Sequence, residues 1–437
     1  MKIANIESLQ ILDSRGNPTI QVEVVLQDGS KGIFQVPSGA STGIHEALEL
    51  RDGNKNVYHG KGVEKAISNV YSVKSHLLNK EFTQEELDRE LIRLDGTPNK
   101  SKLGANAILG VSIAFARATA VSQNKPLYQY LSEIVDAKRI IDKKKKDTFK
   151  PFAVLDQKEH THLFVNVING GQHSGNALNI QEFMLVPIFG TLQDKVRAVS
   201  EIYHALKKII AEKYGKDQTG VGDEGGFAPN IAKATEALDL LVEAIKKMNY
   251  EGKVALALDA AASDFYDAST GLYEVEEGLK LDHKQLTDYW NKLAQKYPLI
   301  SFEDPMAEDD FEGFAYFKQN ITKLKMTNPL NGTNMPLIVG DDLLVTNPAR
   351  VKLAKDKNLC SALLLKINQI GTLTESIEAH QLAQSFGWHT IVSHRSGEAS
   401  DSFISDLCVA MRGSIKLGAP CRGERVAKFN RLLEIFR

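Results

Sequence analysis

The sequence predicts an α/β fold in which a C-terminal parallel (β/α)8-type barrel follows a smaller N-terminal capping domain of the α+β class. Short apolar runs alternate with helical patterns over residues 163–437. Acidic side chains stand at the ends of several of these runs, where a parallel barrel places its active site. Residues 1–140 instead combine a strand hairpin with one long apolar helix, which is typical of a separate domain.

Length and composition limit the classes of protein to consider. The chain has 437 residues, 43% of them hydrophobic and 25% charged, which suits a large barrel plus a smaller unit. The formal net charge of -2 argues against a nucleic-acid partner bound through bulk electrostatics. A local basic groove for a small anion remains compatible with this charge.

Cysteine usage and the apolar runs predict a cytoplasmic protein without a membrane partner. Cys360, Cys408 and Cys421 show neither metal-ligand spacing nor a disulfide framework, which fits reduced thiols. The first residues contain no signal-peptide hydrophobic region, and we expect no apolar run of membrane-spanning length.

The N-terminal domain is expected to span residues 1–140. A strand over 20–26 and a second over 31–36 flank Asp28-Gly29, a hairpin turn signal. The Ser- and Gly-rich stretch 37–43 suits a mobile lid over a ligand, although an ordinary surface loop is the alternative. The Ala-rich segment 104–121 predicts a helix.

Residues 141–162 are expected to be a linker or insertion between the two domains. They include four consecutive lysines at 143–146, and such a run is more often a solvated loop than a binding patch.

Residues 163–437 are expected to form the catalytic barrel. No dinucleotide-binding fingerprint or P-loop occurs in them, which argues against a Rossmann-type cofactor site. Helical periodicity covers 192–210, 231–248 and 373–386. Short buried strands are expected at 183–186, 254–258, 299–302, 337–339, 362–365 and 390–392.

Lys366 is the first candidate for chemistry, because it follows three leucines in the stretch Leu363–Ile370. A lysine at the end of a buried strand rarely lacks a partner or a role. Burial favours the neutral amine, which accepts a proton at neutral pH, so Lys366 is a candidate base. The alternative is a lysine whose long stem reaches out to solvent.

Three carboxylates predict a metal site at the same face of the barrel. Asp259, Glu303 and Asp341 each end one of three successive expected strands. Unpaired, they would repel one another in a low-dielectric pocket, and Mg²⁺ with its preference for oxygen ligands removes that cost. Each acid alone could instead cap the next helix.

Two further segments supply charged groups near the strand ends. Glu224 lies in a glycine-rich loop that could bring its carboxyl into a pocket, although a surface turn is the alternative. Arg395 and Ser396 follow the last expected strand and suit phosphate binding, with a structural salt bridge as the alternative. Lys416 would add a cation at the same rim, and His173 alone is more often structural than catalytic.

Eight motifs in the same order give the chain a resemblance to the enolase family that spans almost its whole length. The motifs are Ser-Gly-Ala-Ser-Thr-Gly at 38–43, Asn-Val-Ile-Asn-Gly-Gly at 166–171, Gln-Glu-Phe at 181–183, Gly-Asp-Glu-Gly-Gly-Phe-Ala-Pro at 222–229, Glu-Asp-Pro at 303–305, Gly-Asp-Asp-Leu at 340–343, Leu-Leu-Lys-Ile-Asn-Gln-Ile-Gly-Thr at 364–372 and Ser-His-Arg-Ser-Gly-Glu at 393–398.

The resemblance implies a hydro-lyase that reversibly dehydrates 2-phosphoglycerate to phosphoenolpyruvate through an enolate-like intermediate stabilised by Mg²⁺. It also implies a homodimer or higher homo-oligomer with a small phosphorylated substrate. By resemblance, Lys366 abstracts the proton and Glu224 is the general acid that helps hydroxide leave. Glu182, near the leaving group, and His173 are also implied to be catalytic, and His394 completes the pocket. The implied ligands of a first Mg²⁺ are Asp259, Glu303 and Asp341, and Ser41 of the lid would bind a second. The substrate phosphate is assigned to Arg395 and Ser396, and the substrate carboxylate to Lys416.

Some positions differ from the common pattern of the family. The segments near 139–160 and 320–334 look longer than usual and are expected to be surface insertions. Glu398-Ala399-Ser400-Asp401 stands where the family usually has Glu-Thr-Glu-Asp, and Leu417 replaces a small polar residue.

Two other functions remain as alternatives at this point. One is a related barrel enzyme that acts on a different carboxylate carbon acid. The other is a binding role, such as the plasminogen capture described for some enolases. That role favours a C-terminal lysine, whereas the given sequence ends in Arg437.

Overall fold

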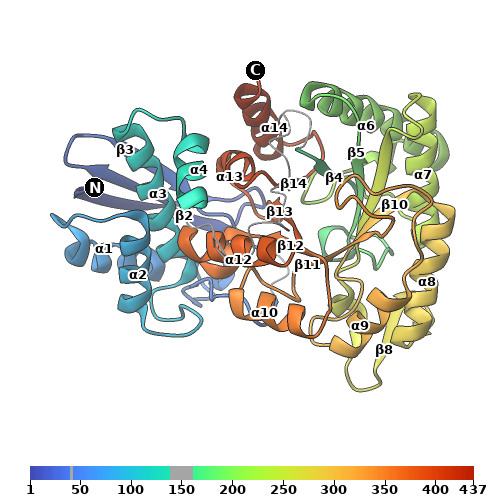
Figure 1. The fold of residues 1–437 in the computed structure, drawn as a ribbon, viewed down its shortest axis with the longest axis horizontal. Coiled ribbons are helices and arrows are strands. Elements are labelled where there is room, and N and C mark those ends of the chain that lie inside the picture. The colour runs from blue at the N-terminus through green and yellow to red at the C-terminus, as the bar shows by residue number, and fades with distance from the viewer. Residues whose placement is uncertain (40–42, 138–160) are drawn as a thin grey trace, which may run out of the picture.

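The computed structural model describes residues 1–39, 43–137 and 161–437, and in these ranges the chain forms two parts that lie side by side (Figure 1). The expected linker and Ser41 fall outside the described residues, so the predicted domain boundaries stay a prediction. The N-terminal part is an antiparallel sheet covered by helices. Its elements are β1 (Ile3–Leu12), β2 (Pro18–Leu26), β3 (Lys31–Gln35), the 3-10 turn η1 (Tyr58–Gly60), α1 (Glu64–Leu77), α2 (Gln84–Asp95), α3 (Ala105–Ser122) and α4 (Leu127–Ala137).

The predicted hairpin and helix of this part are confirmed. β2 and β3 pair antiparallel across the turn, and α3 packs on both strands. The packing is close: a Cβ atom at Gly32 would lie 2.0 Å from the carbonyl oxygen of Ala114, so only glycine fits there. The structure adds β1, which pattern reading did not predict.

One expectation about membranes was too broad. Of the described helices, α3 alone is long and apolar enough to cross a membrane by length and composition. However, 83% of this helix is buried inside the protein, which is typical of a core helix.

The C-terminal part contains a closed barrel of eight strands, which confirms the predicted barrel. All six predicted strands are present, and β4 and β14 complete the ring. In barrel order, the strands are β10 (Leu299–Glu303), β11 (Leu337–Gly340), β12 (Ala362–Leu365), β13 (His389–Ser393), β14 (Ser414–Leu417), β4 (Leu163–Asn169), β5 (Glu182–Pro187) and β6 (Val254–Asp259).

The barrel is not parallel throughout, because β5 runs antiparallel to both of its neighbours. This reversal brings the first residue of β5 to the face where the other strands end. Glu182 therefore lies directly opposite Asp259, the last residue of β6, in the strand register. If β5 ran parallel to its neighbours, its first residue, Glu182, would lie at the opposite end of the barrel.

Helices surround the barrel, and several begin with side-chain caps (Figure 1). Thr191 caps α6 in a capping box with Asp194, and Asp282 caps α8 with Gln285. The elements are α6 (Leu192–Tyr214), α7 (Ala234–Lys247), α8 (His283–Lys296), α9 (Phe311–Asn320), α10 (Pro348–Asp356), α11 (Ile367–Ile370), α12 (Leu373–Ser385), α13 (Phe403–Met411) and α14 (Gly423–Ile435), the short turns η2 (Gly171–His173), η3 (Lys216–Thr219) and η4 (Ala262–Phe265), and a side sheet of β7 (Tyr266–Asp267), β8 (Leu272–Glu276) and β9 (Leu279–Leu281).

The segment 320–334 is more than the surface insertion that we expected. Leu330 is 1% exposed and belongs to the apolar cluster inside the barrel, together with Phe164 and Ile300. The side chain of Asn328 fixes the segment by donating to the carbonyl oxygen of Ile300 at 2.9 Å. The segment therefore helps to fill the barrel near the start of β10.

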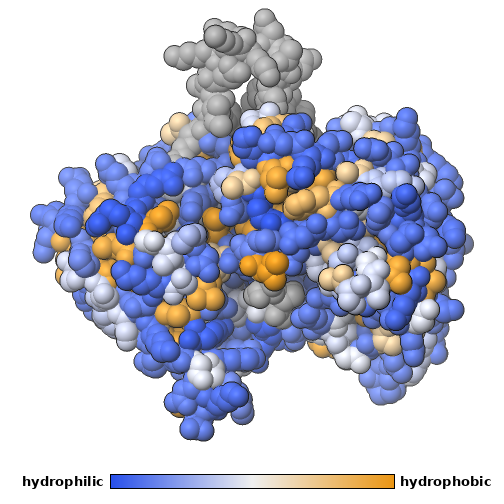
Figure 2. Space-filling view, turned by 90° about the horizontal axis from the view of Figure 1, so that it is seen from below, coloured by the Kyte–Doolittle hydropathy of each residue, from blue (hydrophilic) through white to orange (hydrophobic). Residues whose placement is uncertain are grey.

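The two parts share an interface of buried polar contacts. Asp88 and Ser112 of the N-terminal part accept hydrogen bonds from the backbone N–H groups of Thr374 and Leu373, at the start of α12. The outer surface in Figure 2 is mostly hydrophilic, with hydrophobic residues in several separate areas.

Candidate active site

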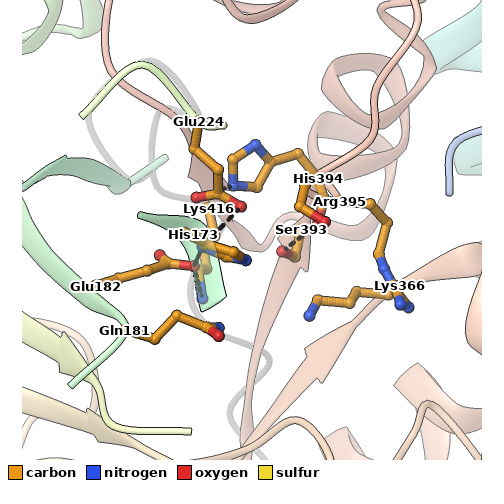
Figure 3. Close-up of a pocket in the computed structure, with 10 residues that line it drawn as sticks. His173, Gln181, Glu182, Glu224, Lys366, Ser393, His394, Arg395 and Lys416 are labelled. Carbon is orange, nitrogen blue, oxygen red and sulfur yellow. Dashed lines mark hydrogen bonds and ion pairs between the residues drawn. The ribbon is translucent and has the colours of Figure 1, made fainter. Parts of the chain in front are cut away.

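A pocket opens among the strand ends of the barrel, and titratable side chains line most of it (Figure 3). Lys366 follows β12, Ser393 ends β13 and Lys416 lies in β14, so the topology brings them to one place. Of the predicted site residues, eight line this pocket. The full lining is His173, Gln181, Glu182, Glu224, Lys366, Ser393, His394, Arg395, Ser396 and Lys416.

Lys416 lies among carboxylates. Its Nζ atom is 2.8 Å from Asp259 Oδ2, 2.7 Å from Glu303 Oε1 and 3.2 Å from Glu182 Oε1. All four side chains are buried. Burial lowers the pKa of Lys416, but Asp259 and the other carboxylates outweigh it and raise the pKa well above its usual value. Lys416 is therefore a permanent cation here.

Lys366 forms an ion pair with Asp341, so the prediction that its amine is neutral is wrong for this structure. Burial lowers the pKa of Lys366, yet the Asp341 carboxylate more than compensates, so the pKa of Lys366 is raised. Asp341 also accepts a hydrogen bond from Gln369 Nε2 at 2.8 Å. The buried Asp304 carboxylate orients the backbone here, accepting from the N–H groups of Asp341 and Asp342.

The predicted metal ligands lie at the ends of three adjacent strands: Asp259 ends β6, Glu303 ends β10 and Asp341 directly follows β11. In the described residues, Asp259, Glu303 and Asp341 do not form a group with ligand atoms within 4.8 Å of one another. The ammonium groups of the two lysines lie against these acids and supply the positive charge.

The donor set nevertheless fits a hard divalent cation. It consists of buried carboxylate oxygens, the ligands that Mg²⁺ prefers. Burial and the neighbouring Asp259 raise the pKa of Glu303 well above its usual value, because ionised acids that lie close together in a buried site repel one another. A bound cation would offset this repulsion.

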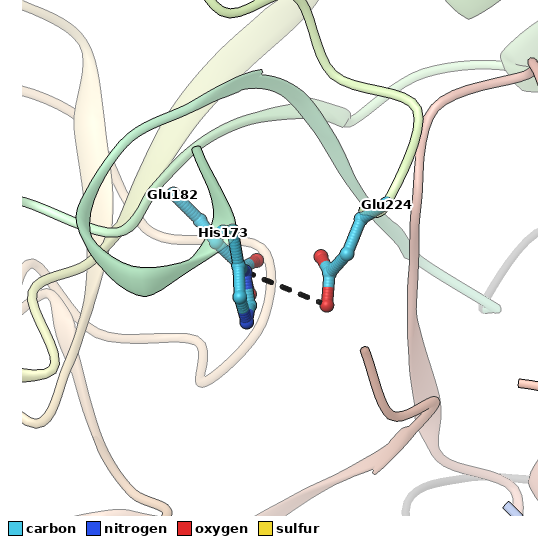
Figure 4. A group of neighbouring side chains, drawn as sticks. All are labelled: His173, Glu182 and Glu224. Atoms are coloured by element: carbon cyan, nitrogen blue, oxygen red, sulfur yellow. Dashed lines mark ion pairs between the residues drawn. The ribbon is translucent and has the colours of Figure 1, made fainter. Parts of the chain in front are cut away.

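Across the pocket from Lys366 lies a cluster of three titratable side chains (Figure 3). Figure 4 shows this cluster of His173, Glu182 and Glu224 alone. His173 Nδ1 is 3.7 Å from Glu182 Oε1 and 3.7 Å from Glu224 Oε1. Burial lowers the pKa of His173, so the ring is neutral. Burial and the nearby Glu224 raise the pKa of Glu182 well above its usual value. The pKa of Glu224 falls well below its usual value despite its burial, because the polar ring of His394 and the cationic Arg425 favour its ionised form. The two glutamates therefore share one proton, held on Glu182 in this arrangement.

The predicted phosphate-binding arginine already has an anionic partner. Arg395 Nη1 donates to Glu46 Oε2 at 3.0 Å and to Asn368 Oδ1 at 3.3 Å. Gly39 packs against the other side of the guanidinium, where a Cβ would lie 1.8 Å from Nη2. Ser396 lines the same part of the pocket.

Sequence reasoning missed several residues that shape this site. Asn166, Gln181 and Gln369 stand inside the quoted motifs, so the motifs were a signal that could have singled them out. Glu46 and Arg425 carried no local signal, because their contacts join segments that are far apart in the chain.

Comparisons with known proteins cover both parts of the chain. Residues 162–436 match the family model of the enolase C-terminal TIM barrel domain, and residues 3–131 match that of the enolase N-terminal domain. The chain is similar to enolase 1 of Entamoeba histolytica, with 47% identity over 450 residues, 100% of this chain and 96% of the relative. It is also 48% identical to the enolase of Methanocaldococcus jannaschii over 438 residues, 99% of this chain and 95% of the relative.

Proposed function

The chain belongs to the enolase family of hydro-lyases, and from this premise we propose that it reversibly dehydrates 2-phosphoglycerate to phosphoenolpyruvate in glycolysis and gluconeogenesis. One observation carries the proposal. A lysine and a pair of glutamates that shares one proton line the same buried pocket, together with the guanidinium of Arg395 (Figure 3). A proton can thus leave one carbon of the substrate while another reaches the departing hydroxyl.

Lys366 is the proposed base. Its Nζ takes the proton from C2 of the substrate, and the electron pair of the C–H bond stays on the substrate. Lys366 can do this only as a neutral amine, so Asp341 must first turn away or be neutralised.

Glu224 is the proposed acid. As the bond between C3 and oxygen breaks, Glu224 donates a proton to the leaving hydroxide, and water departs. Glu182 supports this step, because the pair holds the proton and the two carboxyl groups lie within 4.8 Å of each other, a gap that one bridging water can span for proton transfer to Glu224. In the reverse direction, the same carboxylates take a proton from water.

Binding of the substrate is assigned to the cations of the pocket. Arg395 would hold the phosphate with its fork and Ser396 would donate a hydrogen bond to it. Lys416 would bind the substrate carboxylate. Ser41, predicted to reach the phosphate side from the lid, lies outside the described residues.

We propose two Mg²⁺ ions per site. Asp259, Glu303 and Asp341 would hold the first, and Ser41 with the substrate phosphate the second. When bound, the metal supplies positive charge that stabilises the negative charge developing on the substrate carboxylate. We also propose a cytoplasmic homodimer or higher homo-oligomer, supported by the family and by unpaired cysteines.

A direct assay tests the proposed function. Purified protein is mixed with 2-phosphoglycerate and Mg²⁺, and formation of phosphoenolpyruvate is followed by its ultraviolet absorbance. We expect turnover that EDTA abolishes and added Mg²⁺ restores. Absence of turnover with Mg²⁺ present would favour a related barrel enzyme that acts on a different carbon acid.

A further inference from the structure

The ring of His394 lies between a buried arginine and a buried glutamate. Its Nδ1 atom is 2.6 Å from Arg425 Nη1, and its Nε2 atom is 3.3 Å from Glu224 Oε2. His394 is 1% exposed and Arg425 is fully buried, so water does not compete for either ring nitrogen. The two partners therefore decide where the proton of the ring resides.

The chemistry of the guanidinium determines which ring nitrogen of His394 carries the proton. An arginine side chain stays protonated in proteins and has donors but no acceptor. The nitrogen facing it, Nδ1 of His394, must therefore accept a hydrogen bond and carry no proton. Burial lowers the pKa of His394 to about 3, so the ring is neutral and its single proton is on Nε2, which points to Glu224.

Arg425 cannot easily turn away from this position. It donates to the carbonyl oxygens of Arg395 and Ser396 at 2.6 Å each and to that of Asp223 at 3.2 Å. Its stem packs on Gly418, where a Cβ would lie 3.0 Å from Arg425 Cδ. One side chain from α14 thus joins the loops that carry the proposed acid and the phosphate-binding residues.

We propose that Arg425 is a positioning residue that locks His394 in the Nε2–H tautomer and thereby directs the proton transfer of Glu224 to one oxygen. Asn166 Nδ2 donates a hydrogen bond to Glu224 Oε2 at 3.0 Å, and Nε2 of His394 lies 3.3 Å from the same oxygen. Oε1, which faces His173, is left to exchange protons. The catalytic consequence rests on the proposed role of Glu224, whereas the tautomer does not.

The tautomer can be read directly, without turnover. The protein has 11 histidines, so the whole chain is labelled with ¹⁵N-histidine and long-range ¹H–¹⁵N spectra are recorded at neutral pH. The His394→Gln variant identifies the His394 signals by their disappearance. We expect the wild-type ring to carry its proton on Nε2 alone, and a proton on Nδ1 would overturn the proposal.

Two variants separate positioning from a merely structural role. Arg425→Gln removes the charged donor and is too short to keep the contact, so an Nδ1–H form should appear. Arg425→Lys keeps a charged donor and should retain the Nε2–H form. We expect kcat for dehydration to fall about tenfold in Arg425→Gln and less in Arg425→Lys. An unchanged single tautomer in Arg425→Gln would overturn the proposal.

A further measurement covers the case in which Arg425→Gln does not fold. In wild-type protein labelled on both arginine and histidine, the hydrogen bond from Nη1 to Nδ1 should produce a ¹⁵N–¹⁵N scalar coupling. Its presence supports the proposed lock, and a His394 Nδ1 signal without this coupling would contradict it. Neither result depends on whether 2-phosphoglycerate is the substrate.

Discussion

Two lysines carry positive charge into the pocket, and their surroundings suit them to different tasks. Lys416 contacts three carboxylates, which raise its pKa well above the usual value and keep it charged. Among the described residues, Lys366 forms an ion pair with Asp341, the carboxylate that raises its pKa most, so a change at this carboxylate should lower the pKa. At the level of single residues, Lys366 is therefore the better candidate for a base and Lys416 for an anion ligand.

The division of labour between base and acid gives the first prediction. Lys366→Ala should abolish exchange of the C2 proton of 2-phosphoglycerate with deuterium from solvent, because no other amine takes its place. Glu224→Gln should retain part of this exchange while dehydration falls by about 10²-fold or more, because acid and base act on different atoms. Exchange is followed by NMR, and dehydration by absorbance. Lys352→Ala, which removes an exposed lysine on α10, is the control. Exchange that persists in Lys366→Ala would remove this lysine from the role of base.

The contact between Glu46 and Arg395 gives the second prediction. A phosphate that binds the guanidinium must compete with the Glu46 carboxylate, which lies 3.0 Å from Nη1. Glu46→Gln keeps the shape but removes the competing charge, so the Kd for inorganic phosphate should fall about tenfold. Isothermal titration calorimetry measures this without turnover.

A matched variant tests whether the effect comes from direct contact. Glu312→Gln removes one negative charge from an exposed position in the first turn of α9. Its Kd for phosphate should stay within about twofold of the wild-type value, since exposed charges are screened. Equal effects of both variants would mean that net charge, rather than the Glu46 contact, controls phosphate affinity.

At the scale of elements, short apolar runs were enough to predict six barrel strands, because buried strands read as nearly continuous hydrophobic segments. β14 was not predicted, because it has only four residues and one of them is the charged Lys416. The reversed direction of β5 was also missed, since an apolar run has the same pattern in either direction.

The same limit applies to the candidate site. The sequence singled out eight lining residues, and most of them stand at or next to a strand end in the chain. The sequence did not show which charged side chains contact one another. The contacts of Lys416 with Asp259 and Glu303, and of Arg395 with Glu46, depend on strand register and loop packing. These are set in three dimensions and leave no spacing rule in the sequence.

A contact between two barrel strands gives a prediction about pH. His389, at the start of β13, lies 2.8 Å from Ser414 Oγ at the start of β14. Burial lowers the pKa of His389 to about 4, whereas an unfolded histidine has a pKa near 6.5. At a pH between these two pKa values, His389 binds a proton in the unfolded chain but not in the folded chain. The stabilisation is therefore complete above pH of about 6.5 and is lost as pH falls towards about 4.

Urea unfolding at two pH values checks this sign. From pH of about 7 to about 5, the free energy of unfolding should fall by about 1–2 kcal/mol more in the wild-type protein than in His389→Gln. Glutamine can keep a hydrogen bond to Ser414 Oγ but does not titrate. If both proteins lose the same free energy, His389 does not contribute to the pH dependence.

At the scale of the whole molecule, the two parts depend on each other for their hydrogen bonds. The first turn of α12 belongs to the barrel, yet two of its backbone N–H groups are satisfied by Asp88 and Ser112 of the N-terminal part. Arg117 of α3 adds a two-pronged ion pair with Asp401, at 2.8 and 2.7 Å. Because the unfolding of one part alone would break these hydrogen bonds and expose the interface to water, we expect the parts to unfold together.

Asp88 offers the sharpest test of this coupling. Asp88→Leu leaves the N–H of Thr374 without its acceptor in a buried interface, which should cost about 1–3 kcal/mol. Asp88→Asn keeps a carbonyl oxygen for that N–H and serves as the control. Both tryptophans, Trp290 and Trp388, lie in the barrel part, so their fluorescence follows that part while far-UV circular dichroism follows the whole chain. In the wild-type protein and Asp88→Asn, the two signals should change at the same urea concentration, whereas in Asp88→Leu they should separate. Coincident transitions in Asp88→Leu would show that this contact does not couple the parts, and that the interface is held by apolar packing such as that of α13 on α4.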